Sequence, residues 1–235
     1  MIKIGCCGFS RKRAEYFQQV SLVEVQRTFY KLPRLETCQR WRAEAPRGFE
    51  FTLKAWQLIT HQPSSPTYRK AKLKVDKPDE CGFFRPSREV FDAWEKTLES
   101  AKALEARIVL FQCPPSFGAS PENLANMRAF FTAVGRGELI FAWEPRGDWS
   151  DQVIEELCSE LDLVHCVDPF QRQPVHGELA YFRLHGTTGY RYRYTDEDLA
   201  RVLEWCSEYP EAYCLFNNAS MFDDALRLKA EASLS

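Results

Sequence analysis

The sequence lacks several features that would place it in a specialised class of protein. No stretch of the 235 residues approaches the roughly 20 apolar residues of a membrane-spanning helix, so no membrane partner is expected. Residues 1–5 carry no basic segment followed by a long apolar core, which predicts no secretion signal and a cytoplasmic location. The formal net charge is only -2, which gives no overall attraction to nucleic acids but leaves room for a local basic surface.

Cysteine and histidine motifs are also missing. The nine cysteines are odd in number and include no Cys-x-x-Cys pair, so we expect free thiols in a reducing compartment. Cys81 lies in a polar loop and is expected to be the most exposed thiol. The four histidines form no His-x-x-x-His or Glu-x-x-His pair, whereas zinc sites usually have more nitrogen ligands. We therefore assign no metal ligands, and the sequence does not indicate whether a cofactor is used.

The sequence does contain a regular alternation of strand-like and helix-like segments. Eight segments are short and rich in β-branched or aromatic residues, namely 2–6, 21–26, 49–54, 107–113, 139–144, 162–167, 180–185 and 212–217. Helical patterns with start signals cover 35–45, 87–105, 121–134, 150–160, 196–208 and 220–231. Eight strands alternating with helices predict a single α/β domain over residues 1–235, a TIM-like (β/α)8 barrel, with an open doubly wound sheet as the alternative.

Two segments interrupt this alternation. Residues 55–86 contain four prolines and many lysines, and they predict a long loop at the rim after the third strand. Residues 168–179 contain two prolines and are too short for a full helix, so the sixth helix should be shortened. Long loops at the carboxyl ends of barrel strands are where such folds often carry functional residues.

Polar side chains concentrate on one face of the predicted strands. Because successive strand side chains point to opposite faces, Phe51 and Leu53 should face the helices, while Thr52 and Lys54 should face the barrel interior. The polar residues toward the carboxyl ends of the strands are Glu24, Lys54, Gln112, Glu144, Asp168, Arg183 and His185. They predict a shared polar pocket at the end of the barrel where barrel enzymes have their active sites. The alternative is an internal ion-pair network, in which these acids and bases only neutralise one another.

Several motifs resemble one family in their order along the chain. They are Ile4–Phe9, Val23–Tyr30, Phe49–Lys54 with Ile59–His61, Leu110–Phe117, Glu144–Arg146 with Trp149, Tyr181–Gly186 and Phe216–Asn218. This pattern is similar to that of the YecE-like family, also called domain of unknown function family 72. The resemblance implies a TIM-like barrel and implies no reaction. Cys6, Cys7 and Phe9 depart from the Thr, Ser and Trp usual in the first motif, which removes two hydroxyl groups.

The leading hypothesis is a pocket for a phosphorylated or otherwise anionic ligand, with a hydrolase or lyase reaction possible and its type open. Arginine binds such anions in bidentate geometry, and histidine exchanges protons near neutral pH. The candidate catalytic residues are Glu24, Lys54, Glu144 and His185. The candidate ligand-binding residues are Tyr30, His61, Gln112, Arg146, Asp168, Arg183, Asn217 and Asn218.

Two alternatives stay open. A metal-dependent phosphodiesterase or endonuclease would use His61, Glu144, Asp168 and His185 as ligand types. A non-catalytic nucleic-acid-binding module would use the segment 189–194, in which Arg191, Tyr192 and Arg193 alternate aromatic and guanidinium groups. These tyrosines would equally well form a packed lid over the barrel. The oligomeric state is not predicted.

Overall fold

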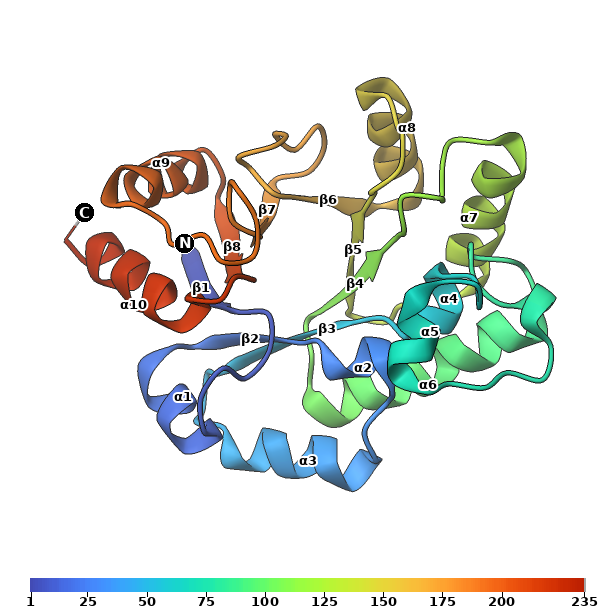
Figure 1. Cartoon of the computed structure of the whole chain (residues 1–235), viewed down its shortest axis with the longest axis horizontal. Helices are drawn as coiled ribbons and strands as arrows, with labels where there is room; N and C mark the ends of the chain where they lie inside the picture. Colours follow the sequence, from blue (N-terminus) through green and yellow to red (C-terminus); the bar gives the residue numbers. More distant parts are fainter. Residues whose placement is uncertain (235) are drawn as a thin grey trace.

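The computed structural model describes residues 1–234, in which eight parallel strands close into a barrel in sequence order, β1 next to β8. The strands are β1 (Ile2–Cys6), β2 (Leu22–Val25), β3 (Glu50–Lys54), β4 (Ile108–Gln112), β5 (Ile140–Glu144), β6 (Leu163–Val167), β7 (Leu179–Leu184) and β8 (Glu211–Phe216). Helices surround this barrel (Figure 1). The predicted TIM-like barrel is confirmed, and the open sheet is not formed.

The two faces of each strand have separate roles. In β4, Val109 and Phe111 point outward into the main core under the helices, whereas Ile108 and Leu110 point into the barrel. The apolar residues that fill the interior are Cys7, Leu22, Ile108, Leu110, Ala142, Cys166, Tyr181, Tyr213 and Leu215. They plug the middle of the barrel, so polar interior residues are confined to its two ends.

Seven helices cover the strands. They are α1 (Arg13–Gln19), α3 (Leu35–Glu44), α6 (Arg88–Leu104), α7 (Pro121–Ala133), α8 (Asp151–Leu161), α9 (Asp196–Ser207) and α10 (Met221–Ala232). Ser87, Ser120 and Ser150 cap three of them through their hydroxyl groups, and Thr195 forms a capping box with Asp198. The sequence did not predict α1, because this seven-residue helix has no side-chain cap at Lys12.

The predicted long segment after β3 is present, whereas the sixth helix is missing from the described residues rather than shortened. After β3 the chain forms the short helices α4 (Gln57–Thr60) and α5 (Pro66–Ala71) and the turn η1 (Pro78–Glu80) before α6 begins. A further short helix, α2 (Arg27–Tyr30), follows β2. None of the described residues 168–178 forms a helix, and the amides of Gln171 and Arg172 bond to the Asp168 carbonyl in a single turn.

All nine cysteines are unpaired and buried. This corrects the expectation for Cys81, whose side chain is fully buried. The amide of Gly82 donates to the Leu58 carbonyl and that of Phe84 to the Ile59 carbonyl, so the segment is held against α4 and its thiol faces inward. Within residues 1–234, no helix combines the length and apolar character needed to cross a membrane.

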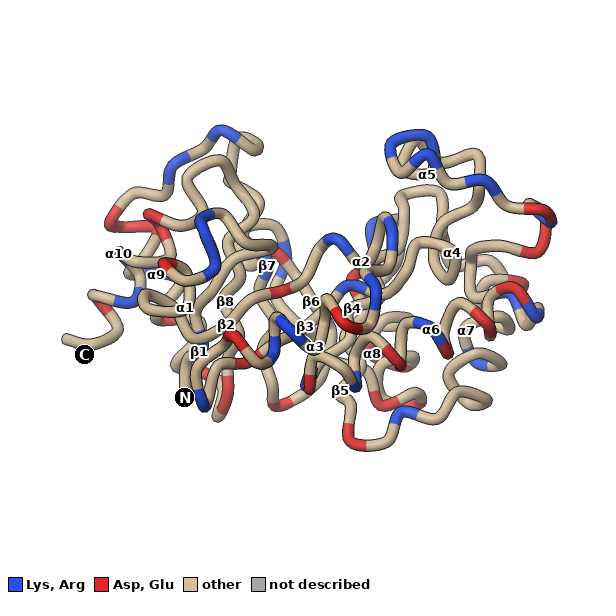
Figure 2. Tube along the Cα trace, turned by 90° about the horizontal axis from the view of Figure 1, so that it is seen from below, with Lys and Arg blue, Asp and Glu red and all other residues tan. Residues whose placement is uncertain are grey.

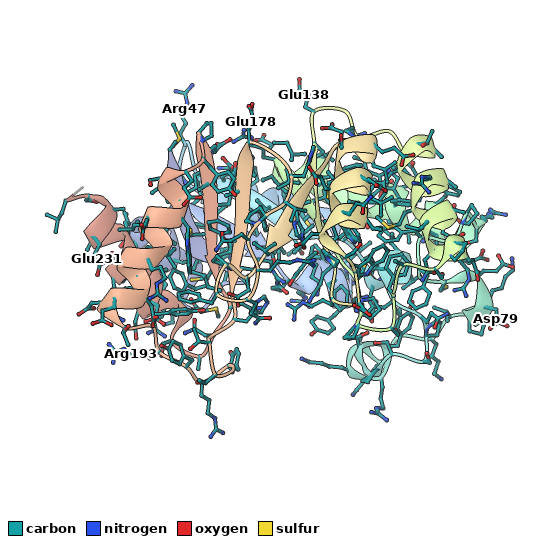
Figure 3. The ribbon with its side chains drawn as sticks, turned by 90° about the horizontal axis from the view of Figure 1, so that it is seen from above. Arg47, Asp79, Glu138, Glu178, Arg193 and Glu231 are labelled. Atoms are coloured by element: carbon teal, nitrogen blue, oxygen red, sulfur yellow. The ribbon has the colours of Figure 1, made fainter. Side chains whose placement is uncertain are left out.

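Figure 3 shows the two ends of the barrel. Arg47, Glu138 and Glu178 precede β3, β5 and β7, and they lie together at the amino end of the strands. Arg193 follows β7 and projects from the opposite end. We call this opposite end, formed by the carboxyl ends of the strands and the segments that follow them, the mouth.

Candidate functional site

Arg183 of β7 occupies the centre of the mouth. Its side chain is 1% exposed and lies between two carboxylates from other strands. Its Nη2 donates to Oε1 of Glu24 at 3.0 Å, and its Nη1 donates to Oε2 of Glu144 at 2.5 Å. A buried charge without a partner costs several kcal/mol, so these three groups depend on one another. This part of the predicted ion-pair network is present.

Glu24 of β2 is the innermost member of the cluster. It is fully buried, and the Gln26 amide also donates to its Oε1. The Tyr181 hydroxyl donates to its Oε2 at 2.7 Å, and Thr52 lies 2.8 Å from the same hydroxyl. Both carboxylate oxygens of Glu24 therefore accept hydrogen bonds, and Glu24 holds Arg183 from the interior side of the barrel.

Glu144 of β5 bridges the buried and the accessible parts of the mouth. Besides Arg183, its carboxylate accepts from Nε of Arg146 at 2.8 Å and from Nη2 at 2.5 Å. Burial alone would raise the pKa of Glu144, but the guanidinium groups of Arg183 and Arg146 lower it to about 2. Glu144 is thus a stable carboxylate at neutral pH and a weak proton acceptor.

His185 connects Arg146 to Asp168. Nη2 of Arg146 lies 2.7 Å from Nε2 of His185, and Oδ2 of Asp168 lies 3.3 Å from Nδ1. Because a guanidinium only donates, Nε2 must accept, so Nδ1 carries the proton and donates to Asp168. Oδ2 of Asp168 also accepts from the His185 amide at 3.1 Å, which fixes the orientation of the residue.

These side chains line a pocket of about 250 Å³ between β5, β6 and β7. Its polar lining residues are Glu144, Arg146, His165, Asp168, Gln171, Arg172 and His185. A larger hollow of about 580 Å³ lies beside α6 and the segment before β5, at the amino end and outside the barrel. Because the polar cluster is at the mouth, we place the candidate site in the smaller pocket.

Lys54 ends β3 beside this cluster but has different partners. Its Nζ donates to Oε1 of Gln112 and lies 3.6 Å from the centre of the Phe29 ring. Among residues 1–234, no carboxylate comes within ion-pair distance of it. Burial and, after it, repulsion from Arg183 lower the pKa of Lys54 from 10.5 to about 7, because they outweigh the attraction of Glu144 and Glu24.

His61 and Tyr30 lie beside Lys54 and at the rim. The His61 ring packs 4.8 Å from the Phe29 ring, with Nδ1 2.8 Å from the Thr60 hydroxyl. Burial and the positive charge of Lys54 lower the pKa of His61 to about 3, so His61 is neutral at pH 7. Tyr30 is half-buried, and its hydroxyl lies 3.4 Å from Nζ of Lys70 in α5.

The two asparagines after β8 have different environments. The half-buried Asn217 follows Tyr213 and Leu215 on the interior face, and its backbone N–H donates to the Leu184 carbonyl. Asn218 is fully buried, and its Nδ2 donates to the Tyr192 carbonyl and to Asp224. Asn218 therefore supports the segment after β7 and does not line the pocket, where we expected it to bind ligand.

The tyrosines of that segment are not equivalent. The Tyr194 hydroxyl accepts from the Gly186 amide, and the Tyr192 hydroxyl donates to Asp198 at 2.6 Å. These two rings pack at 5.3 Å and belong to the wall. Tyr190 is 61% exposed instead, and the exposed Arg191 and Arg193 follow it in the chain. The alternation of tyrosine and arginine indicated this segment, but not which tyrosine would be free.

Positive charge is concentrated at the mouth. Eight segments follow the strands, namely 7–12, 26–34, 55–87, 113–120, 145–150, 168–178, 185–195 and 217–220. Together they carry fifteen Lys and Arg residues against six Asp and Glu residues, although the whole chain has a net charge of -2. Figure 2 shows basic residues on the projecting α5 and on the segment after β7, at the same end of the molecule. The small overall charge allowed for a local basic surface, and this surface lies at the mouth.

No three His, Cys, Asp or Glu side chains among residues 1–234 converge in a way that would hold a metal ion. Of the four ligand types considered for a metal-dependent phosphodiesterase, His61 packs on Phe29, whereas the trio of Glu144, Asp168 and His185 lines the pocket. Within that trio, Glu144 binds arginines and Asp168 binds His185. The two carboxylates of this trio therefore have arginine or histidine as hydrogen-bond partners.

Comparisons with known proteins agree with this fold. Residues 6–234 match the family model described as protein of unknown function DUF72. The chain is 22% identical over 249 residues to the UPF0759 protein YunF of Bacillus subtilis (strain 168), covering 92% of this chain and 83% of that protein. A crystal structure of a DUF72 family protein from Enterococcus faecalis V583 matches with a TM-score of 0.73 at 22% identity, covering 100% of this chain and 98% of that one.

More distant barrels share the fold alone. Endonuclease IV from Thermus thermophilus matches with a TM-score of 0.53 at 11% identity, covering 99% of this chain and 97% of that one. At this identity the match shows the arrangement of strands and helices, not the chemistry. The family match covers nearly the whole chain, as the motifs in the sequence had implied. The chain belongs to the DUF72 family of proteins of unknown function.

Proposed function

We propose that the protein binds a small anionic ligand, most simply a phosphorylated metabolite, in the pocket at the mouth. The observation that carries this proposal is the separation of charge: the segments after the strands are strongly basic, while the chain as a whole is slightly acidic. A basic opening over a low-dielectric interior attracts anions and concentrates them at the site.

The pocket supplies hydrogen-bond donors for such a ligand. Among residues 1–234, no group accepts from Nη1 of Arg146, although its Nε and Nη2 are bound to Glu144 and His185. Arg172 contributes a second guanidinium, which Asp151 and the Trp149 carbonyl hold in place. Glu144 and Asp168 already have cationic or N–H partners, so they orient the arginine and the histidine and leave Nη1 for the ligand.

The same geometry supports proton transfer to or from the bound ligand. His185 is 20% exposed, lines the pocket and is oriented by Asp168. Histidine held in this way is a general acid or base in many enzymes. We therefore propose a hydrolase or lyase reaction on the anionic ligand, with His185 as the group that exchanges the proton and Glu144 as the group that positions Arg146.

A test compares Arg146→Gln with the control Arg128→Gln. Arg128 is an exposed arginine on α7 that pairs with Glu160 on α8, so the control also removes one paired arginine. Calorimetric titration with inorganic phosphate and a panel of phosphorylated sugars should detect binding to the wild-type protein. Losing a hydrogen bond to a charged group costs about 1.5–3 kcal/mol, so Arg146→Gln should weaken binding roughly 10- to 100-fold. Equal affinities for the two variants would rule out this pocket.

A second candidate function is binding of a nucleic-acid strand across the mouth. One observation favours it: the exposed Tyr190 is followed by the exposed Arg191 and Arg193, and the basic α5 projects from the same end. Stacking of a base on an aromatic ring contributes about 1–3 kcal/mol, so Tyr190→Ala should weaken binding of a single-stranded oligonucleotide at least fivefold. Binding that is independent of salt would contradict this candidate, whereas a small phosphorylated ligand should not require Tyr190 at all.

A reducing compartment is the setting that fits this protein. All nine cysteines are unpaired, and the Sγ atoms of Cys206 and Cys214 lie 3.1 Å apart without a bond. An oxidising compartment would favour closing such a pair into a disulfide. We therefore propose that the protein works in the cytoplasm, where phosphorylated metabolites are also found.

A further inference from the structure

Lys54 differs from the other cations at the centre of the mouth. Arg183 contacts Glu24 and Glu144, and Arg146 contacts Glu144. Lys54 is 6% exposed, yet its ammonium group contacts only the amide oxygen of Gln112 and the face of the Phe29 ring among residues 1–234. Neither partner is charged, and Gln112 is the one hydrogen-bond acceptor of the ammonium group within that part of the chain.

A neutral amine satisfies this environment better than an ammonium ion does. Gln112 needs one N–H donor, which an amine retains. The Phe29 ring attracts an ammonium ion by only about 0.5–2 kcal/mol, which is less than the several kcal/mol that burying an unpaired charge costs. The pKa of about 7 agrees, because burial and Arg183 disfavour the charge. The nucleophilic amine is therefore a major form near pH 7, whereas it is roughly three in ten thousand for a lysine of ordinary pKa.

We propose that Lys54 is a covalent nucleophile that forms an imine with the carbonyl group of an anionic ligand, such as a phosphorylated aldehyde or ketone. The inference rests on the proposed function, because the anionic group would be held by Arg146. Lysines desolvated beside another cation are the ones that enzymes use for this purpose.

The step is chemically complete with the groups present. The amine attacks the carbonyl carbon, a C–N bond forms, and the carbonyl oxygen takes up the proton that the nitrogen loses. The resulting carbinolamine then expels its hydroxyl group as water, taking the second nitrogen proton, and a C=N bond remains. The products are an imine and one water molecule, and no oxidant, reductant or co-reactant is consumed.

The placement of Lys54 suits a short ligand with two functional groups. Lys54 bonds to Gln112, which is the register partner of Glu144 across β4 and β5, and Glu144 in turn holds Arg146. The amine therefore lies next to the pocket of about 250 Å³ that Glu144 and Arg146 line. A three-carbon aldehyde phosphate carries its carbonyl group at one end and its phosphate group at the other, and it is small enough for this pocket. Glyceraldehyde 3-phosphate is therefore a suitable probe, and glyceraldehyde is its uncharged match.

The experiment traps the imine in the wild-type protein. Each probe is incubated at pH 7 with the full chain, borohydride then reduces any imine to a stable secondary amine, and peptide mapping by mass spectrometry locates the adduct. With glyceraldehyde 3-phosphate, Lys54 should be modified at least tenfold more than the exposed Lys70 and Lys72, which measure background reactivity. Inorganic phosphate should protect Lys54 by competition, and Lys54→Arg should lose this adduct alone.

The outcomes separate the two proposals. If phosphate binds in titration but borohydride fixes no probe on Lys54, the anion site stands and the imine proposal is overturned. If both probes label Lys54 equally and phosphate does not protect it, the imine stands and the anion site falls. Adducts spread over exposed lysines, with Lys54 unmodified, overturn the imine whatever the stability of the Lys54→Arg variant, because this measurement uses the wild-type chain.

Discussion

Replacing Glu144 by Gln removes one negative charge from the centre of the mouth and changes almost no volume. In the wild-type protein the pKa of Glu144 falls from its ordinary value of 4.5 to about 2, because the attraction of Arg183 and Arg146 exceeds the effect of burial. A lowered carboxylate pKa stabilises the folded state above the unfolded pKa, and this stability is lost as the pH falls through the folded pKa. The difference corresponds to about 3 kcal/mol at pH 7.

Urea unfolding at pH 7 and at pH 3 measures this effect directly. Glu144→Gln should lower the free energy of unfolding by about 3 kcal/mol at pH 7, which is roughly 6–12 °C in melting temperature for a chain of this size. The deficit should shrink between pH 4.5 and pH 2, because the wild-type carboxylate itself becomes protonated there. Glu204→Gln, on the exposed face of α9, is the control. A cost equal to that of the control, or one that does not change with pH, would refute the electrostatic reasoning.

Two further predictions concern other parts of the mouth. Lys54→Met should raise the free energy of unfolding at pH 7 by up to about 4 kcal/mol. The reason is that folding lowers the pKa of Lys54 from 10.5 to about 7, so the charged lysine destabilises the folded state. This destabilisation is complete below pH 7 and disappears above pH 10.5, where the lysine is neutral in both states. A destabilised variant in chemical denaturation would instead make Lys54 a structural residue. Gly186→Ala should cost at least about 2 kcal/mol, because φ is +90° and a Cβ would lie 2.3 Å from the Gly189 carbonyl oxygen. Thermal melting measures this cost, and Gly118→Ala, where a Cβ meets nothing within 4 Å, should be nearly neutral in the same assay.

The barrel could be predicted because its signals are local. Alternation along β3 placed Lys54 inside and Leu53 outside, and the structure agrees. Serine or threonine caps marked the starts of α6 to α9, where a hydroxyl satisfies the first free amides. The uncapped α1 and the short helices after β2 and β3 escaped prediction, since tertiary packing rather than propensity forms such short helices.

The pairing inside the site was not predictable from the sequence. Alternation brought Glu24, Glu144, Lys54 and Arg183 to the same end of the barrel, but it does not say which carboxylate binds which cation. That choice depends on the stagger of the strands and on side-chain reach, which put two carboxylates on Arg183 and none on Lys54. Asn218 shows the same limit, because its role depends on the fold of a segment 26 residues away.

The two ends of the barrel help to decide between a structural network and a functional site. At the amino end, Lys3 pairs with Glu50 and Glu211, and Arg107 pairs with Glu211 at 2.5 Å. Every one of these charges has an opposite partner, as an ion-pair network requires. The mouth follows this rule for Arg183 and departs from it at Lys54.

That departure has a thermodynamic consequence. A lysine buried without a carboxylate lowers stability, and the same fold shows at its other end that strand register can provide lysine with carboxylates. Strained or uncompensated groups of this kind are found where function needs them. The ion-pair network therefore explains Glu24, Glu144 and Arg183 as a rigid structural support for the site. The burial of Lys54 beside them lowers stability, so a reaction is the better explanation for its presence.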